Sequence, residues 1–371
     1  MDIKVNQIPH INVDKVVTTL SLMYSNTINK NVALSTLPSV MLWGQPGVGK
    51  SQSIYELASV IEENTNKKVN VTDVRLILFN PVDLRGIPTS NADKTLAIWL
   101  KPKIFDMDSS SNVVNILFLD ELSSCSQAVQ AAAYQITLDK KVGEHKLPDN
   151  TIVIAAGNRT IDRSVSFNMP KALANRLLHI EVESSFESWN KWAIKSGIHP
   201  YILGFLNFNP TLLNTFDPKS ESLAFATPRS WEMVSNILNN VSDDIELVYD
   251  LIEGLVGKGT AVEFKQYTKI YSKLPNVENI FKGIETKVPK EPDVIYALIT
   301  SMVSYARKNK KNIDLIDNSI QYANNLPPDF QVVLLKDYMY IEAGFKSKLL
   351  ESCSFRTWIS KRGRLLDEAS N

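Results

Sequence analysis

Short apolar segments alternate with amphipathic ones over the first half of the chain. Short, largely apolar runs of strand length, one of which alternates before it becomes continuously apolar, occupy residues 38–43, 69–78, 113–119, 151–156 and 177–182. Residues at helical spacing occupy 11–25, 52–62 and 128–138. Strands that are apolar on both faces and separated by helices predict an α/β domain with a parallel sheet.

The pattern changes beyond about Phe186. Strand-like runs are absent from there on, and amphipathic helical patterns such as ESWNKWAIKSG and PRSWEMVSNILNN continue to the end. We therefore expect a domain boundary within 184–200, followed by an all-helical remainder.

Composition places the chain among soluble globular proteins. Of 371 residues, 44% are hydrophobic and 22% charged, and 40 basic residues balance 40 acidic ones. A net charge of zero argues against a dominant nucleic-acid or membrane footprint, although a local basic patch remains open. Cys125 and Cys353 form no CxxC pair, so neither a disulfide framework nor a zinc site is indicated. Without a signal-peptide pattern or a run of membrane-spanning length, we expect a cytoplasmic protein with no membrane partner.

The segment GQPGVGKS at 44–51 matches the pattern GxxxxGK[ST] and lies between an apolar strand and a helix. Its glycines let backbone N–H groups face phosphate oxygens, and the following helix directs its positive end to the same point. Lys50 would reach the β- and γ-phosphates, and the Ser51 hydroxyl would bind Mg²⁺. The predicted nucleotide-binding residues are Gly44, Gln45, Pro46, Gly47, Val48, Gly49, Lys50, Ser51 and Gln52.

The apolar run ILFL leads directly into Asp120 and Glu121. In a parallel sheet, a carboxylate at the end of such a strand lies beside the phosphate loop. Asp120 would hold Mg²⁺ through its water shell, and Glu121 could orient or activate the attacking water. This order favours a hydrolase over a small-molecule kinase, which needs no base directed at water.

The run TIVIAA is followed by Gly157, Asn158 and Arg159. An amide at the end of a strand beside the acidic one could hold the lytic water against the γ-phosphate. The alternative is an ordinary turn, in which asparagine is frequent.

These motifs together resemble the AAA+ ATPases, specifically the MoxR-type branch of the P-loop NTPases with a helix-2 insert. The resemblance runs from about residue 35 to 270 and rests on GQPGVGKS, ILFLDE, AAGNR, ALANRL and ATPRSW in that order. The segment PVDLRGIP at 81–88 looks like the insertion of this branch. The segment KKVGEHKLP at 140–148 looks like its hairpin before the asparagine-bearing strand.

Carried over to this sequence, the resemblance implies that Lys50 and Ser51 are Walker A residues and that Asp120 and Glu121 are Walker B residues. Asn158 matches the sensor 1 position. The implied cofactors are ATP and Mg²⁺.

The resemblance also assigns two arginines. Arg176 in ALANRL matches the arginine finger that enters the neighbouring subunit's site, and Arg229 in TPRSW matches sensor 2, which reaches from the helical lid. A guanidinium stabilises charge on the transferring phosphoryl group, and supplying it in trans ties hydrolysis to assembly. A structural salt bridge is the alternative for both. Arg159 and Arg163 lie close to the same edge, so the identity of the finger is open among these two and Arg176.

The family organisation implies an N-terminal helical segment, an AAA+ core, a helical lid and a C-terminal helical region at 1–34, 35–190, 191–275 and 276–371. The working form would be a homo-oligomeric ring, most readily a hexamer. Hydrolysis would then shift the two insertions, and Asp83, Leu84, Arg85 and residues 142–145 would face a client. By resemblance, the client is a protein that the ring remodels or activates, often one with a von Willebrand factor A-type domain.

Two alternatives remain at this level. Related rings translocate nucleic acid or act in restriction, and the basic segment KRGR at 361–364 near Phe355 and Trp358 would suit that role, although a solvated tail is the favoured interpretation. A nucleotide-gated scaffold without turnover is disfavoured because base, sensor and finger candidates are all present. The client, the ring size, the choice between ATP and GTP and the role of the C-terminal region stay open.

Overall fold

The computed structural model describes residues 8–159, 169 and 171–363 and falls into two compact units. The first unit runs to Ser185, and the second begins at Phe186; the short segment Asp217–Ser220 groups with the first unit. No helix within the described ranges combines the length and apolarity needed to cross a membrane.

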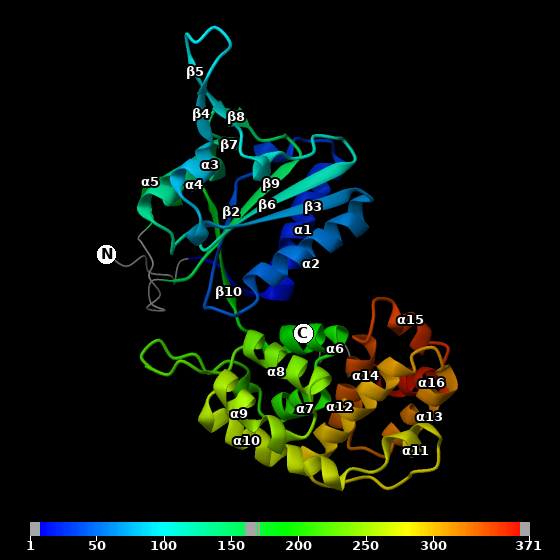
Figure 1. Cartoon of the computed structure of the whole chain (residues 1–371). Helices are drawn as coiled ribbons and strands as arrows, with labels where there is room; N and C mark the ends of the chain where they lie inside the picture. The colour runs from blue at the N-terminus through cyan, green and yellow to red at the C-terminus, as the bar shows by residue number, and fades with distance from the viewer. Residues whose placement is uncertain (1–7, 160–168, 170, 364–371) are drawn as a thin grey trace. The chain divides into compact units, whose positions relative to one another are not determined.

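The first unit is built on a six-stranded sheet in which every pairing is parallel (Figure 1). In spatial order the strands are β1 (His10–Asn12), β10 (Leu178–Glu183), β2 (Val40–Trp43), β9 (Thr151–Gly157), β6 (Val113–Asp120) and β3 (Lys68–Arg75). The predicted α/β fold with a parallel sheet is therefore confirmed. The edge strand β1 was not predicted, because three residues are too few to carry a periodic pattern.

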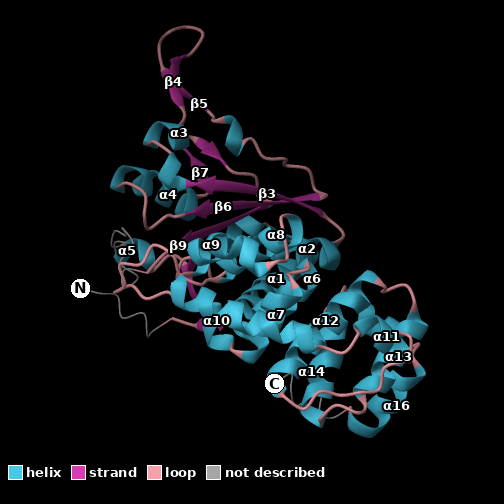
Figure 2. Ribbon diagram, turned by 60° about the horizontal axis from the view of Figure 1, so that its bottom comes forward, coloured by secondary structure: helices cyan, strands magenta, loops and turns pink. Residues whose placement is uncertain are grey.

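Helices cover both faces of this sheet. The larger helices of the first unit are α1 (Val13–Asn29), α2 (Lys50–Thr65) and α4 (Gln127–Asp139). On β6, Ile116 and Phe118 join the hydrophobic cluster with α1 and α2, whereas Leu117 and Leu119 join the cluster with α4 on the opposite face. Figure 2 shows the strands between these two helical layers. Burial on both faces explains why the strands are continuously apolar.

The prediction that a strand covers 69–78 is wrong at its end. Strand β3 stops at Arg75, and Leu76–Leu78 forms a 3₁₀ turn. Leu76 is buried in the core beneath the sheet, but Leu78 is 75% exposed. Consecutive apolar residues thus do not indicate a buried strand here, because only one of the three enters the core.

Two small insertions interrupt the regular alternation. The first comprises α3 (Pro81–Arg85) and an antiparallel ribbon of β4 (Ile87–Ser90) and β5 (Ala97–Leu100), which was not predicted. The second is the expected hairpin within 140–148, formed by β7 (Lys141–Val142) and β8 (His145–Lys146). The His145 Nε2 atom lies 2.7 Å from the Trp99 carbonyl oxygen, at hydrogen-bonding distance, so the insertions contact each other. In Figure 1 the ribbon extends away from the sheet of its own unit.

The remaining elements are helical. The short α5 (Lys171–Ala174) belongs to the first unit. The helices of the second unit are α6 (Phe186–Ser196), α7 (Pro200–Phe208), α8 (Pro228–Asn240), α9 (Ile245–Val256), α10 (Lys258–Thr268), α11 (Val277–Phe281), α12 (Pro292–Lys308), α13 (Ile313–Ala323), α14 (Pro328–Met339), α15 (Phe345–Leu349) and α16 (Cys353–Arg362). The expected change to an all-helical remainder after about Phe186 is confirmed for the residues described.

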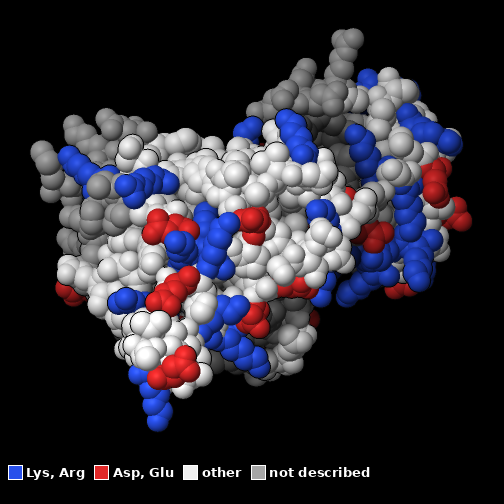
Figure 3. Space-filling view, turned by 90° about the horizontal axis from the view of Figure 1, so that it is seen from above, with Lys and Arg blue, Asp and Glu red and all other residues white. Residues whose placement is uncertain are grey.

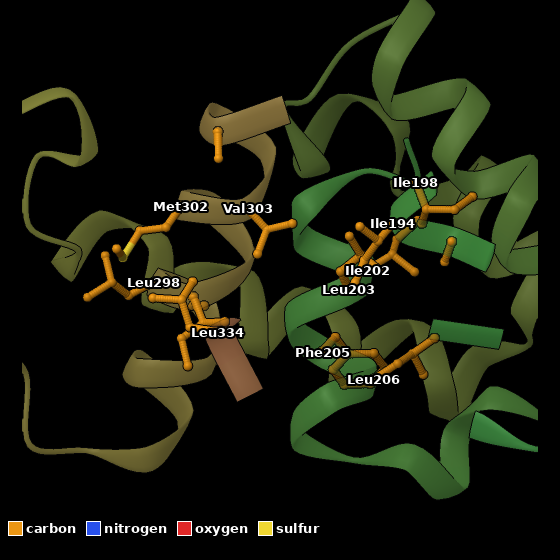
Figure 4. Packing of buried hydrophobic residues seen from close by; sticks show 14 of the residues in the cluster. Ile194, Ile198, Ile202, Leu203, Phe205, Leu206, Leu298, Met302, Val303 and Leu334 are labelled. Atoms are coloured by element: carbon orange, nitrogen blue, oxygen red, sulfur yellow. The ribbon is translucent and has the colours of Figure 1, made fainter. Parts of the chain in front are cut away.

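One hydrophobic cluster unites the second unit. It contains side chains from Trp189 to Trp358, including the fully buried Trp231 and Phe264. Figure 4 shows apolar side chains of α7 and α12 within this cluster. The proposed subdivision of the helical part near residue 275 remains a prediction.

Candidate active site

The candidate site lies where three neighbouring strands end. In the sheet, Trp43 of β2 pairs with Gly157 of β9, and Ala155 of β9 pairs with Leu119 of β6. The residues that follow β2, β9 and β6 therefore meet at one edge. This edge is where open parallel sheets bind ligands.

The phosphate-loop segment connects β2 to α2. Gly47 and Gly49 adopt positive φ angles of 78° and 101°. Gly49 is also the N-cap of α2 and makes no side-chain cap, so the first N–H groups of the 16-residue helix have no side-chain acceptor at that position. A helix N-terminus with this geometry is suited to an anion.

Lys50 is 9% exposed, and its ammonium group is held at the centre of this edge. Nζ donates hydrogen bonds to the carbonyl oxygens of Gly44 at 2.7 Å and Gln45 at 2.9 Å. It also donates to the side-chain oxygen of Asn158 at 3.1 Å. Lys50 in the GQPGVGKS segment and Asn158 after β9, which are 108 positions apart in the sequence, are thus in direct contact.

Ser51 and Asp120 provide a pair of oxygen ligands. The Ser51 hydroxyl donates to Asp120 Oδ2 at 3.0 Å, and Asp120 Oδ1 accepts the Glu121 N–H at 2.8 Å. Hydroxyl and carboxylate oxygens are the donors that Mg²⁺ prefers, and the ion usually completes its shell with water and phosphate oxygens. The described residues contain no cluster of three His, Cys, Asp or Glu side chains that could hold a metal. The oxygens of Ser51 and Asp120 fit a Mg²⁺ ion that binds together with a nucleotide.

Glu121 follows with an unusual backbone. Its φ of 61° lies in the left-handed region, which costs a non-glycine residue on the order of 1 kcal/mol. The turn sends the chain out of β6 while the Leu122 N–H still donates to the Ala156 carbonyl at 2.8 Å. Among the hydrogen bonds between described residues, none involves the half-buried Glu121 carboxylate. A carboxylate in that position can accept a proton from water.

Ser123 is a residue of this site that the sequence did not reveal. Its hydroxyl accepts a hydrogen bond from the Asn158 N–H at 2.9 Å and donates one to the Asn158 carbonyl at 3.1 Å. The only available signal was a polar residue just after the acidic pair, which many surface turns share.

The arginine candidates differ in their surroundings. Arg159 forms an ion pair with the buried Glu181, with 2.5 Å between Nη1 and Oε1. Arg176 is exposed in the turn before β10 and makes no ion pair with the described residues. Arg163 lies outside the residues that the structure describes.

Arg229 belongs to the second unit, so the structure does not place it against the phosphate loop. It is the second residue of α8 and is exposed. The helix begins there because the Thr227 hydroxyl accepts the Ser230 N–H at 3.1 Å and Pro228 follows the cap.

Comparison with known proteins identifies the first unit. Residues 40–183 match the family model described as "ATPase family associated with various cellular activities (AAA)". A search of curated proteins gives no match. These residues form an AAA ATPase domain, and the chain is an ATP hydrolase.

Solved structures with similar folds have low identity. A candidate ATPase from Cytophaga hutchinsonii is 16% identical, with a TM-score of 0.31 over 86% of this chain and 88% of the other. A mutant RuvB of Thermotoga maritima is 15% identical, with a TM-score of 0.32 over 79% and 83%. The ORC1 protein of Aeropyrum pernix in complex with DNA is 9% identical, with a TM-score of 0.38 over 72% and 70%.

Proposed function

We propose that the chain is a MoxR-type AAA+ ATPase whose ring, most readily a hexamer, uses ATP hydrolysis to remodel or activate a client protein. A client with a von Willebrand factor A-type domain fits the resemblance. The observation that carries the proposal is the pair of joined insertions beside the ATPase core, one of which presents an apolar surface.

That surface is concentrated in one short segment. Among the described residues, 20 large hydrophobic side chains are exposed, and eight of them lie within 77–104. They are Ile77, Leu78, Val82, Ile87, Leu96, Ile98, Leu100 and Ile104. This density of exposed apolar side chains along one segment supports an interaction site for a protein. We call residues 77–104 the apolar insertion.

The site residues take the following roles in this proposal. Lys50 neutralises phosphate charge, while Ser51 and Asp120 would hold Mg²⁺, which would supply electrostatic stabilisation of the phosphoryl group. Glu121 accepts the proton of the attacking water, and Asn158 positions that water. Arg176 provides the trans-acting guanidinium, because it is exposed and unpaired among the described residues, whereas Arg159 is paired within its own chain. Arg229 acts from the helical lid.

The nucleic-acid alternative lacks available aromatic side chains beside its basic segment. Phe355 and Trp358 are 0% and 4% exposed, so neither ring is available to stack on a base. Arg362 donates to the Gln331 side-chain oxygen at 2.6 Å, while Arg364 lies outside the described residues. On the face shown in Figure 3, Lys and Arg side chains lie beside Asp and Glu side chains. These observations favour a protein client.

The first test compares ATPase rates with and without nucleic acid. We expect single-stranded DNA, double-stranded DNA and RNA to leave the rate of the wild-type chain unchanged. Glu121→Gln should lower kcat by roughly 100-fold or more while ATP still binds, because a general base typically contributes a factor of 100 to 10,000. Glu63→Gln, an exposed glutamate on α2, is the matched control and should retain the wild-type rate.

The second test concerns the client. The Glu121→Gln chain is crosslinked in a nucleotide-depleted extract of the source organism to which ATP or ADP is added. It should retain a partner in the presence of ATP and lose that partner in the presence of ADP. Adding Ile98→Asp on the apolar insertion should abolish retention, whereas adding Leu247→Asp, an exposed leucine on α9, should not. Stimulation of ATP hydrolysis by a nucleic acid, with retention insensitive to Ile98→Asp, would contradict the proposal in favour of a nucleic-acid motor.

A further inference from the structure

The turn after β6 stays attached to β9 although the strand itself has ended. Strand β6 stops at Asp120, and the left-handed Glu121 redirects the chain. Two further connections continue the pairing: the Leu122 N–H donates to the Ala156 carbonyl at 2.8 Å, and the Ser123 hydroxyl binds Asn158. The turn that carries Glu121 is therefore tied to the end of β9.

Ser123 contacts both backbone polar groups of Asn158. Its oxygen accepts the N–H at 2.9 Å and its hydroxyl donates to the C=O at 3.1 Å. One side chain thus makes the two backbone hydrogen bonds that a paired strand would otherwise make. Ser123 is only 4% exposed, so water does not readily replace it. Losing such a partner leaves two polar groups of Asn158 without their hydrogen bonds.

The surroundings of Ser123 require this close approach. A Cβ atom on Gly157 would lie 2.7 Å from Ser123 Oγ and 2.8 Å from the Met41 side chain, which only glycine avoids. On the other side, the buried Gln130 amide donates to the carbonyl oxygens of Ser123 at 3.3 Å and Cys125 at 3.4 Å. Both the serine and the strand end are thus held in place.

The same connection reaches the phosphate loop. Asn158, held by Ser123 through its backbone, accepts a hydrogen bond from Lys50 through its side chain. We propose that Ser123 is a positioning residue for ATP hydrolysis, which sets Asn158 relative to Glu121 without contacting nucleotide or water. This inference rests on the roles given to Glu121 and Asn158 under the proposed function.

Kinetics of Ser123→Ala test the inference. We expect kcat to fall by roughly 10- to 100-fold, because small displacements of reacting groups cost factors of this size. KM for ATP should stay within about twofold, because Lys50 and Ser51 are unchanged. Ser124→Ala is the matched control: its hydroxyl makes no hydrogen bond to described residues, and kcat should not change.

A double mutant separates positioning from simple stabilisation. If Ser123 acts through Asn158, Ser123→Ala in an Asn158→Ala background should cause no further loss of kcat, since the effects of residues acting as one unit do not add. A residue that merely stabilises the fold would lower the unfolding temperature and leave the kcat of the folded protein intact.

The outcomes are distinct. Wild-type kcat for Ser123→Ala, together with a reduced kcat for Asn158→Ala, would overturn the positioning role and leave the proposed site standing. Additive losses in the double mutant would overturn it as well. Wild-type kcat for Asn158→Ala would instead refute the assignment of Asn158, and the inference would fall with it.

Discussion

Asp337 is buried in α14 with a side chain that is 3% exposed. Its Oδ1 accepts a hydrogen bond from the Asn190 amide at 3.1 Å, while Oδ2 has no hydrogen-bond partner among the described residues. Burial raises the pKa of this carboxyl group to about 7, against the opposing effects of Asn190 and of the neighbouring Lys336. Lys336 itself forms a salt bridge with Glu187.

This carboxyl group makes stability depend on pH. Between about pH 4 and pH 7 the folded protein retains a proton that the unfolded chain releases, so the free energy of unfolding falls as pH rises and levels off above the folded pKa. A shift of this size corresponds to about 4 kcal/mol. Asp337→Asn, which stays neutral, should therefore be more stable than wild type at pH 8, and this gain should vanish at pH 4.

Urea unfolding of both chains from pH 4 to pH 8 measures this difference. Asp250→Asn, at an exposed position on α9, should reproduce the wild-type pH profile. A constant difference between Asp337→Asn and wild type at every pH would show that Asp337 ionises freely in the folded protein.

At this scale, the sequence predicts local chemistry but not contacts across the fold. Lys50 and Ser51 are predicted as neighbours of phosphate because the loop, the preceding strand and the following helix are contiguous in sequence, and their roles stay predictions. Ser123 and Asp337 could not be predicted, because the role of each is set by a partner 35 or 147 residues away. The roles of Glu121 and Asn158 remain predictions, although the structure brings Asn158 into contact with Lys50.

At the scale of elements, burial decided which strands the sequence could predict. The strands of four to eight residues at the centre of the sheet have a clear apolar pattern because both of their faces are buried. The ribbon of β4 and β5 has exposed apolar side chains at Ile87 and Leu100, so no alternation of polar and apolar residues marks it. Gly86, which directly precedes β4, closely approaches the backbone at the end of β5.

Gly86 is a specific requirement of this ribbon. Its φ is 93°, and a Cβ atom there would lie 2.0 Å from the carbonyl oxygen of Leu100. Because that oxygen belongs to the backbone of the paired strand, it cannot move aside without breaking the pairing. Gly86→Ala should therefore separate β4 from β5 locally, with faster amide hydrogen exchange within residues 86–101 and little change in the sheet of the same unit.

Gly254 is the matched control for that substitution. It lies within α9, has no positive φ, and a Cβ atom would meet nothing within 4 Å. Gly254→Ala should leave exchange in the ribbon unchanged and stabilise the helix by roughly 0.5–1 kcal/mol. Unchanged exchange in Gly86→Ala would mean that the ribbon forms without the turn at Gly86.

At the scale of the whole molecule, the predicted catalytic groups belong to two different compact units. The first unit contains the phosphate loop, the acidic pair and Asn158, whereas Arg229 belongs to the second unit. Each unit has its own hydrophobic core, which is the mark of a structural unit that holds its fold by its own packing. Sequence motifs identify such groups but carry no information on how bodies meet, which is why the roles of Arg229 and Arg176 stay predictions.

Mixing two inactive variants tests whether Arg176 acts across subunits. The Lys50→Ala subunit should fail to bind ATP productively, but it still supplies Arg176 to its neighbour. The Arg176→Ala subunit keeps an intact phosphate loop but supplies no arginine to its neighbour. In a randomly mixed ring, a site is complete when the phosphate loop of an Arg176→Ala subunit receives Arg176 from an adjoining Lys50→Ala subunit. Equal mixing should then restore up to about a quarter of wild-type activity if sites work independently.

Arg159→Ala provides the control, because its ion pair with Glu181 lies within one chain. Its loss should impair the subunit that carries it, so mixing Arg159→Ala with Lys50→Ala should restore nothing. Steady-state ATPase rates of each variant alone, and of mixtures assembled at increasing ratios, measure both effects. Recovery with Arg159→Ala but not with Arg176→Ala would reverse the assignment and make Arg159 the residue that completes the neighbour's site.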